Sequence, residues 1–330
     1  MGELSWKDWE GKEMIINFVG NFQNNYVGEL GDATHLAREI EALGHIVRKI
    51  PQDEWREHVL DGKPYPNVPA DLKADINIIL KWHHFYDGRF IGELKRESKA
   101  PLFYWVWDYM QNEDWHMKAV EACDLYLGND VRSGLYKDKA YYFPFDVADG
   151  DIPIVKATNQ DIDVAFFGSW IDQGDRQKYL TELNRTTPIV AFSWNYTQWP
   201  AEFHVKPPVY GEEFNQVVAR SKIVLGFSVE PNAWGYWSNR VGKTLVAGGF
   251  LLYQYAPGME LFLRDGVEYF SSIEEAREKI DHYLIAEDER NEIAKRGFQI
   301  GQHRFSSRER VKDLMILIER YLKGHDGWKY

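Results

Sequence analysis

The chain has 330 residues, of which 44% are hydrophobic and 27% are charged, and its formal net charge is −12. This length predicts two domains, and the acidic excess disfavours a large nucleic-acid-binding surface, because such surfaces are usually basic. One cysteine, Cys123, excludes an internal disulfide framework, and the absence of a signal-peptide pattern or an apolar run of about 18 residues predicts a cytoplasmic protein without a membrane span.

The N-terminal half alternates between apolar runs and helical patterns. Residues 14–19 predict a first strand, residues 33–43 have helical periodicity, and residues 46–50 predict a second strand. Four more apolar runs predict further strands, at residues 74–80, 101–107, 123–130 and 140–146. This alternation predicts an α/β domain with a parallel sheet.

Glycines and ionisable residues follow these strands or begin the first helix, near the edge where an open α/β sheet builds its ligand site. The candidates for acid–base chemistry are His35, His83, His84 and Asp108, and those for a loop that approaches a ligand are Gly20, Asn21 and Gly28. The glycines do not have the GxGxxG spacing, so a dinucleotide fingerprint is excluded. The histidine spacing predicts no metal site. The alternatives are structural histidines and a turn that requires glycine.

A second series of strands and helices follows a polar stretch with glycine and proline, which predicts a linker over residues 151–160. The predicted strands cover residues 162–170, 188–194, 222–228, 250–253 and 267–270. The predicted helices cover residues 175–183, 212–221, 240–247, 273–284, 288–303 and 306–324. The same alternation predicts a second parallel α/β domain.

Residues 237–262 carry the strongest functional pattern in the sequence. Arg240 and Lys243 lie three residues apart on a predicted short helix, so they share a face. A buried strand follows, and then a loop that contains Gly258, where backbone amides can approach a ligand. This arrangement favours an anionic ligand at the carboxyl ends of parallel strands. The alternative is that both cations pair with acids on a solvated helix face.

The tripeptide Gly242–Thr244 has the letters GKT that end a P-loop, but its context excludes one. A P-loop requires glycine five residues before the GKT glycine, and Trp237 occupies that position. The helix also leads into a strand, whereas a P-loop follows a strand.

The pattern SxRxxKxLxxGGFLL, followed by PGxELF and the three last helices, resembles the C-terminal domain of GT-B glycosyltransferases, and most closely the CgeB-like group of glycosyltransferase-1-type domains. The resemblance covers about residues 210–322 specifically. Over the first half it rests on strand order, the FVGNF opening and the FFGSW strand. It implies an α/β fold of two doubly wound Rossmann-like domains that face each other across a cleft. The implied divisions are an acceptor domain over residues 1–150, a linker over 151–160, a donor domain over 161–305, and a helix over 306–330 that crosses back toward the first domain.

The resemblance also implies a metal-independent Leloir glycosyltransferase (EC 2.4) without a cofactor. Its donor would be a nucleotide diphosphate sugar, for example a UDP-sugar, and retention of configuration is slightly favoured over inversion. The implied donor-binding residues are Gly168, Ser169, Arg240, Lys243, Thr244, Pro257, Gly258, Met259 and Glu260. The N-terminal domain would bind the acceptor and supply any base.

Lys243 departs from the pattern of many GT-B enzymes, which carry at this position a glutamate that binds the ribose hydroxyls. Lysine cannot accept those hydrogen bonds, so the ribose contact would fall to Glu260 or a backbone group. The acceptor is unidentified: an envelope glycan, a protein, a small molecule or a modified DNA base, the last disfavoured by the net charge. The competing interpretation is a non-catalytic nucleotide- or sugar-binding module. An epimerase of the same fold is a third.

Overall fold

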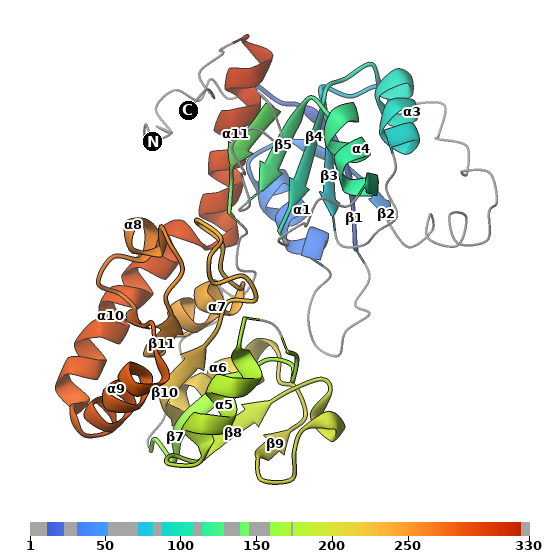
Figure 1. Cartoon of the computed structure of the whole chain (residues 1–330). Coiled ribbons are helices and arrows are strands. Elements are labelled where there is room, and N and C mark those ends of the chain that lie inside the picture. The colour runs from blue at the N-terminus through green and yellow to red at the C-terminus, as the bar shows by residue number, and fades with distance from the viewer. Residues whose placement is uncertain are drawn as a thin grey trace. The chain divides into compact units, whose positions relative to one another are not determined.

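A computed structural model describes residues 12–22, 32–51, 72–81, 88–107, 114–128, 139–144, 159–172 and 174–324. The chain divides into two compact units. Unit 1 consists of Met1–Ala148 and Ser307–Tyr330, and unit 2 is the continuous segment Asp149–Ser306 (Figure 1).

Unit 1 is built on a six-stranded parallel sheet with the order β2-β1-β3-β4-β5-β6. Its strands are β1 (Ile15–Gly20), β2 (Ile46–Pro51), β3 (Ile76–Lys81), β4 (Leu102–Val106), β5 (Leu125–Gly128) and β6 (Ala140–Tyr142). Its helices are α1 (Asp32–Ala42), α3 (Gly88–Ser98), α4 (Asp114–Ala122) and α11 (Ser307–Leu322). The predicted parallel α/β domain is confirmed.

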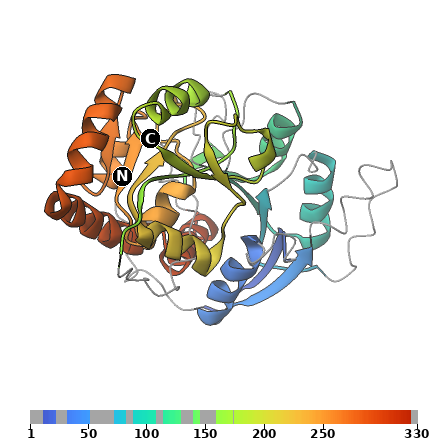
Figure 2. The same ribbon diagram turned by 90° about the horizontal axis from the view of Figure 1, so that it is seen from below.

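Helices cover both faces of this sheet (Figure 2). On one face, Leu36 of α1 and Leu314 of α11 belong to the same apolar core as Phe18 of β1. On the other face, Ile91 of α3 packs in a core with Tyr104 of β4. This two-sided burial explains why the strands read as continuous apolar runs in the sequence. The core on the first face includes residues from α11, which follows all of unit 2 in the chain.

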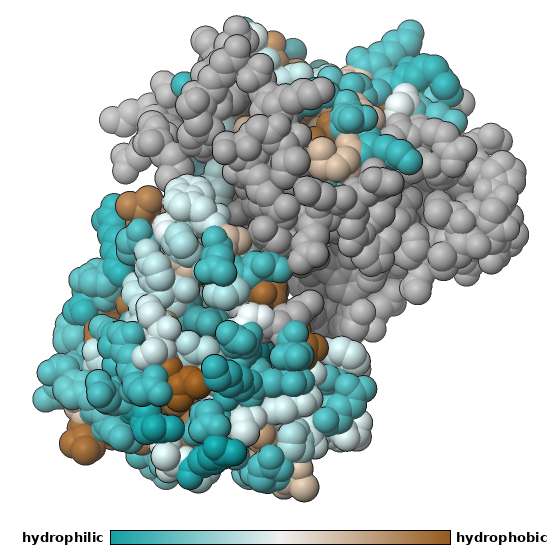
Figure 3. Space-filling model, viewed as in Figure 1, coloured by the Kyte–Doolittle hydropathy of each residue, from teal (hydrophilic) through white to brown (hydrophobic). Residues whose placement is uncertain are grey.

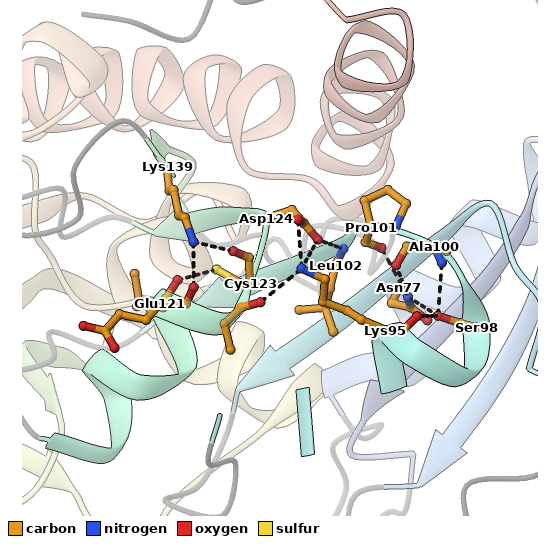
Figure 4. A network of polar contacts seen from close by, with 12 residues as sticks. Asn77, Lys95, Ser98, Ala100, Pro101, Leu102, Glu121, Cys123, Asp124 and Lys139 are labelled. Carbon is orange, nitrogen blue, oxygen red and sulfur yellow. Dashed lines mark hydrogen bonds and ion pairs between the residues drawn. The ribbon is translucent and has the colours of Figure 1, made fainter. Parts of the chain in front are cut away.

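The amino edge of the unit 1 sheet is closed by a network of polar contacts, which Figure 4 shows. Lys95 donates to the Asp124 carboxylate at 2.9 Å, and the other oxygen of that carboxylate accepts from the Leu102 N–H at 2.8 Å. Lys139 donates to the carbonyl of Cys123 at 3.0 Å. Burial raises the pKa of the Cys123 thiol to about 12, so this cysteine is a neutral core residue.

Unit 2 is built on a second six-stranded parallel sheet, with the order β12-β11-β10-β7-β8-β9. Its strands are β7 (Ile162–Phe167), β8 (Ile189–Phe192), β9 (His204–Lys206), β10 (Ser221–Gly226), β11 (Leu251–Gln254) and β12 (Glu268–Phe270). Its α-helices are α5 (Arg176–Asn184), α6 (Gly211–Arg220), α7 (Arg240–Val246), α8 (Met259–Leu263), α9 (Ile273–Ile285) and α10 (Glu287–Arg304). The second doubly wound domain is therefore also confirmed. Strand β9 was not predicted, and α8 begins where a loop was expected.

The two faces of the unit 2 sheet are also covered by different helices. Phe166 of β7 belongs to a core that includes Leu180 of α5 and Ile280 of α9. The next residue, Phe167, points to the opposite face and packs on Phe214 of α6, with ring centroids 4.5 Å apart. The exposed surface of unit 2 in Figure 3 is mainly hydrophilic, with apolar residues scattered across it. Within the described ranges, every helix is too short or too polar to cross a membrane.

Candidate functional site

The strand order of the unit 2 sheet reverses between β7 and β10, which lie side by side although β8 and β9 separate them in the chain. Chain connections leave these two strands toward opposite edges of the sheet, so the carboxyl ends of β7 and β10 form a topological switch point, where open α/β sheets bind ligands. Gly226 ends β10 there, beside a small pocket that Ser238, Arg240 and Tyr253 also line. The pocket has room for about one water molecule, and most of its lining is apolar.

Arg176 begins α5 and is 1% exposed. Its guanidinium lies 5.9 Å from the centre of the Phe166 ring, and its Nη1 donates to the carbonyl of Ser169 at 3.4 Å. The buried Nε has no hydrogen-bond partner among the described residues, and no described carboxylate forms an ion pair with this side chain. A buried cation with so few partners is costly, so its retention points to a ligand.

Arg240 begins α7 on the other face of the sheet and is half-buried. Burial lowers its pKa, while Tyr253 and Tyr236 act in the opposite direction. The pKa of Arg176 is lowered to about 10, first by burial and then by the positive charge of Arg240. Helices from opposite faces thus place two arginines at the carboxyl edge, near enough for the charge of Arg240 to act on Arg176. Their mutual repulsion would be relieved by an anion.

Hydrogen bonds anchor the loop that precedes α7. The Tyr253 hydroxyl accepts from the Ser238 N–H at 3.2 Å, and the Ser238 hydroxyl accepts from the Arg240 N–H at 3.3 Å. Burial is the main cause of the raised pKa of Tyr253, so its hydroxyl stays neutral. The start of α7, and with it Arg240, is therefore held in place by the end of β11.

Gly258 lies at the start of α8 with a φ of 88°, in the left-handed region that favours glycine. A Cβ at this position would lie 2.8 Å from the Trp234 indole, so glycine is also required by this close contact. The carbonyl of the preceding Pro257 accepts from the Gly235 N–H at 2.7 Å. The loops that follow β10 and β11 are therefore joined to each other at the carboxyl edge.

The other predicted donor-binding residues of unit 2 lie along the same edge in different environments. Gly168 follows β7 half-exposed and donates its N–H to the carbonyl of Phe192 at 3.0 Å. Lys243 is half-buried, whereas Thr244 and Met259 are fully buried, and Thr244 lines the small pocket beside Arg240. Glu260 is exposed and forms a hydrogen bond with Tyr255, whose pKa is raised by desolvation and by this carboxylate.

The predicted sites of unit 1 are only partly described. His83, His84, Asp108 and Gly28 lie outside the described residues. His35 lies on α1 and is 3% exposed, and Asn21 is 5% exposed, with its carbonyl accepting from the Ala33 N–H at 3.0 Å. A Cβ at Gly20 would lie 2.5 Å from the Ala33 Cβ, so this glycine permits close packing of α1 on β1. Their roles in acceptor binding and acid–base chemistry stay predictions.

Arg176 is the functional candidate that sequence reasoning missed. It shares the buried face of α5 with Tyr179, Leu180 and Leu183, at helical spacing. A charged residue on an apolar helix face was the available signal. In the part of the chain that the structure covers, no group of three or more His, Cys, Asp and Glu residues is arranged to hold a metal ion.

Comparison with known proteins agrees with this geometry. The sequence profile of the family described as glycosyl transferase-like matches residues 154–316, which covers nearly all of unit 2 and the start of α11. No curated protein sequence matches the chain significantly. The narrower likeness to the CgeB-like group stays a prediction.

Several solved structures share the fold over most of this chain. HepE (Alr3699) from Anabaena, solved with UDP and glucose, has a TM-score of 0.59 and 14% identity, covering 93% of this chain and 100% of its own. The catalytic domain of starch synthase IV from Arabidopsis thaliana, bound to ADP and acarbose, has a TM-score of 0.64 and 10% identity, with coverage of 94% and 100%. An α-glucosyltransferase solved with UDP-glucose and DNA has a TM-score of 0.60 and 10% identity, with coverage of 93% and 100%. The chain therefore has the GT-B fold, and its residues 154–316 match the glycosyl transferase-like family.

Proposed function

We propose that the protein is a glycosyltransferase that uses a nucleotide diphosphate sugar and binds its diphosphate at the carboxyl edge of the unit 2 sheet. The observation that carries this proposal is the meeting of Arg176 and Arg240 at the switch point between β7 and β10. A diphosphate would supply the negative charge that both guanidinium groups lack among the described residues. The family match over residues 154–316 supports the same conclusion.

The reaction requires that the bond between the anomeric carbon and the diphosphate oxygen breaks while a bond to an acceptor oxygen forms. Negative charge then develops on the departing diphosphate, and two fixed arginines stabilise that charge without rearranging. Cationic side chains perform here the task that a divalent metal performs in other transferases, so we expect turnover without added metal. Retention of configuration is the favoured stereochemistry, in which the departing phosphate takes the acceptor proton.

The remaining donor contacts follow from the loops of the same edge. Gly168 and Ser169 would approach the diphosphate, together with Arg176 and Arg240. The backbone of Gly258 would lie against the donor. Glu260, held by Tyr255, would bind the ribose hydroxyls in place of the family glutamate that Lys243 replaces. UDP is the first nucleotide to test, because HepE was solved with UDP.

The acceptor is a separate question, and the proposal leaves it among glycans, proteins, small molecules and modified DNA. Modified DNA is included among the acceptors to test because an α-glucosyltransferase of the same fold was solved with DNA. The net charge of −12 favours the other classes. If inversion were found instead of retention, His35, His83, His84 and Asp108 would be the residues to replace first.

The test is thermal unfolding of the wild type and of Arg240→Ala with a panel of nucleotide sugars. A donor at 100 times its dissociation constant adds about 2.7 kcal/mol to the free energy of unfolding. We expect one nucleotide sugar to stabilise the wild type and to leave Arg240→Ala unchanged. Arg220→Ala is the matched control, because Arg220 belongs to the same unit and pairs with Asp161. No stabilisation by any member of the panel would refute the proposal.

A second candidate function is a binding module that holds the nucleotide sugar without turnover, which the replacement of the family glutamate by Lys243 favours. The two candidates differ in one measurement. A transferase should slowly hydrolyse its donor when no acceptor is present, releasing free sugar and nucleoside diphosphate. A stabilising nucleotide sugar that is recovered intact after long incubation would favour the binding module.

A further inference from the structure

Asn195 follows β8 and joins the loop after β8 to the loop after β7. Its amide oxygen accepts from the Trp170 N–H at 3.1 Å, and its amide nitrogen donates to the Trp170 carbonyl at 3.2 Å. One side chain therefore pairs with both backbone groups of Trp170, as a neighbouring strand would. The connection continues the contact between the two strands, since the Gly168 N–H already donates to the Phe192 carbonyl at 3.0 Å.

The orientation of the Asn195 side chain is itself fixed. Its amide oxygen also accepts from the Ser193 hydroxyl at 2.6 Å, and its amide nitrogen also donates to the Gln198 side chain at 3.1 Å. The residue is 5% exposed, so water does not compete for these four hydrogen bonds. A side chain held in this way is a rigid support for the backbone that it contacts.

The peptide between Ser169 and Trp170 is held from both sides. Asn195 accepts the hydrogen bond from its N–H group, and Nη1 of Arg176 donates to its carbonyl oxygen at 3.4 Å. Because a peptide is planar, its N–H and carbonyl turn together. A rotation that broke the contact with Asn195 would also turn the Ser169 carbonyl away from Arg176.

We propose that Asn195 is a positioning residue for anion binding, which acts through the Ser169–Trp170 peptide on the direction of the Arg176 guanidinium. This inference rests on the proposed function, because it assigns Arg176 to the diphosphate. Asn195 does not contact the donor. Asn195 fixes the Ser169 carbonyl, to which the Arg176 guanidinium donates. Loss of the Asn195 side chain would leave the charge of the site unchanged but would leave the guanidinium without a fixed orientation.

The experiment is calorimetric titration with UDP, in an Asn195→Ala and Arg176→Lys double-mutant cycle. Arg176→Lys keeps the charge but removes the planar guanidinium fork, so binding weakens and remains measurable. We expect Asn195→Ala to weaken UDP binding about tenfold in the wild-type background and less than about threefold in the Arg176→Lys background. A purely structural role would weaken binding equally in both backgrounds.

Asn184→Ala is the matched control, because Asn184 supports backbone at the opposite end of β8. Its amide oxygen accepts from the Ile189 N–H at 2.9 Å, and its amide nitrogen donates to the Glu202 carbonyl at 3.1 Å. We expect Asn184→Ala to lower the melting temperature as Asn195→Ala does and to change the UDP dissociation constant less than about twofold. An equal loss of affinity in both variants would overturn the inference.

The remaining outcomes separate this inference from the function on which it rests. If the wild type binds UDP and Arg176→Lys weakens binding while Asn195→Ala does not, the positioning role is wrong and the function stands. If the wild type binds neither UDP nor ADP, both are wrong. Asn195→Gln is the second variant if Asn195→Ala does not fold, since it keeps a neutral amide but moves it one carbon away from the Trp170 backbone. UDP binding to Asn195→Gln with wild-type affinity would also overturn the positioning role.

Discussion

The basic side chains at the two ends of β7 differ in the partners that the protein gives them. At the amino end, Arg290 is 3% exposed, and it donates to the Tyr283 carbonyl at 2.6 Å and to the Gln160 side chain at 2.9 Å. Two other cations at that end form ion pairs with carboxylates. Arg220 pairs with Asp161 and Lys222 pairs with Asp163, each at 2.6 Å. The amino edge of the unit 1 sheet is closed by internal contacts in the same manner (Figure 4).

At the carboxyl end of β7, Arg176 is as deeply buried as Arg290 but has one long hydrogen bond, to the Ser169 carbonyl, and a second arginine nearby. Burial lowers the pKa of both arginines, so burial alone does not distinguish them. The difference lies in the partners. Arg290 donates two short hydrogen bonds within the protein and so supports the fold, whereas Arg176 makes one long hydrogen bond and is available for a ligand.

The largest expected effect is the loss of nucleotide binding when either arginine of the carboxyl end is replaced by methionine. Arg176→Met should weaken UDP binding more than about 100-fold, because charge-assisted hydrogen bonds to phosphate are lost. The free energy of unfolding should stay the same or rise, because a buried cation without a carboxylate partner is removed. Calorimetric titration and urea unfolding measure the two quantities.

Arg220→Met is the control for that prediction, since it removes a cation from the amino end and should leave UDP affinity within about twofold of the wild type. If Arg176→Met unfolded the protein while Arg220→Met did not, Arg176 would be a structural arginine. The proposed distinction between the two ends of β7 would then fail.

The next effect in size is a loss of stability at the amino end. Arg290→Met should lower the free energy of unfolding by about 2 kcal/mol, because the Tyr283 carbonyl and the Gln160 side chain lose their charged donor in a buried place. Urea unfolding of this variant beside Arg176→Met gives the direct comparison. Equal stability of the two variants would contradict the assignment of different roles to two equally buried arginines.

A smaller effect is expected at Ser272, which begins α9 after β12 at the carboxyl edge. The Ser272 hydroxyl accepts from the Glu275 N–H at 3.1 Å, and the Glu275 carboxylate accepts from the Ser271 N–H at 2.8 Å. Ser272→Ala should therefore lower the free energy of unfolding by about 1 kcal/mol. UDP affinity should not change, because the Ser272 hydroxyl and the Glu275 carboxylate form their hydrogen bonds within the helix terminus.

The smallest expected effect is the contribution of Glu275 to the loss of stability at acid pH. Its pKa is lowered from the ordinary value of 4.5, first by the hydrogen bond from the Ser271 N–H. The ionised carboxylate therefore stabilises the fold above pH 4.5, and this contribution is lost as the pH falls through the lowered pKa. Glu275→Gln should lose less stability than the wild type on acidification below that pH. Parallel slopes in the two proteins would contradict this sign.

The sequence predicts the sheets well because parallel strands covered on both faces are continuous apolar runs, as residues 101–107 illustrate. Strand β9 has three residues and only one apolar side chain, Val205, so it leaves no pattern to detect. Helix α3 was also missed, because Gly88 and Gly92 lower its helix propensity. Local patterns thus predict long buried elements and fail for short or glycine-containing ones.

The site is harder to predict than the fold. Arg176 and Arg290 each lie on the buried face of a helix, three residues before the buried residues Tyr179 and Ile293. The sequence makes them equivalent, and only the partners that tertiary structure brings to Arg290 separate them. Asn195 has no detectable pattern at all, because its role depends on the loop after β7 lying beside the loop after β8.

The division of the chain into units has a consequence for biosynthesis. Helix α11 contributes Val311, Leu314 and Leu317 to the core of unit 1, yet the ribosome makes it after the whole of unit 2. Unit 2 is continuous and can become compact as soon as it leaves the ribosome. Unit 1 cannot complete its core until α11 is translated, about 160 residues after the rest of unit 1. The usual order, in which the N-terminal part matures first, is therefore reversed. During synthesis, the apolar face of unit 1 that α11 covers is a natural binding surface for chaperones.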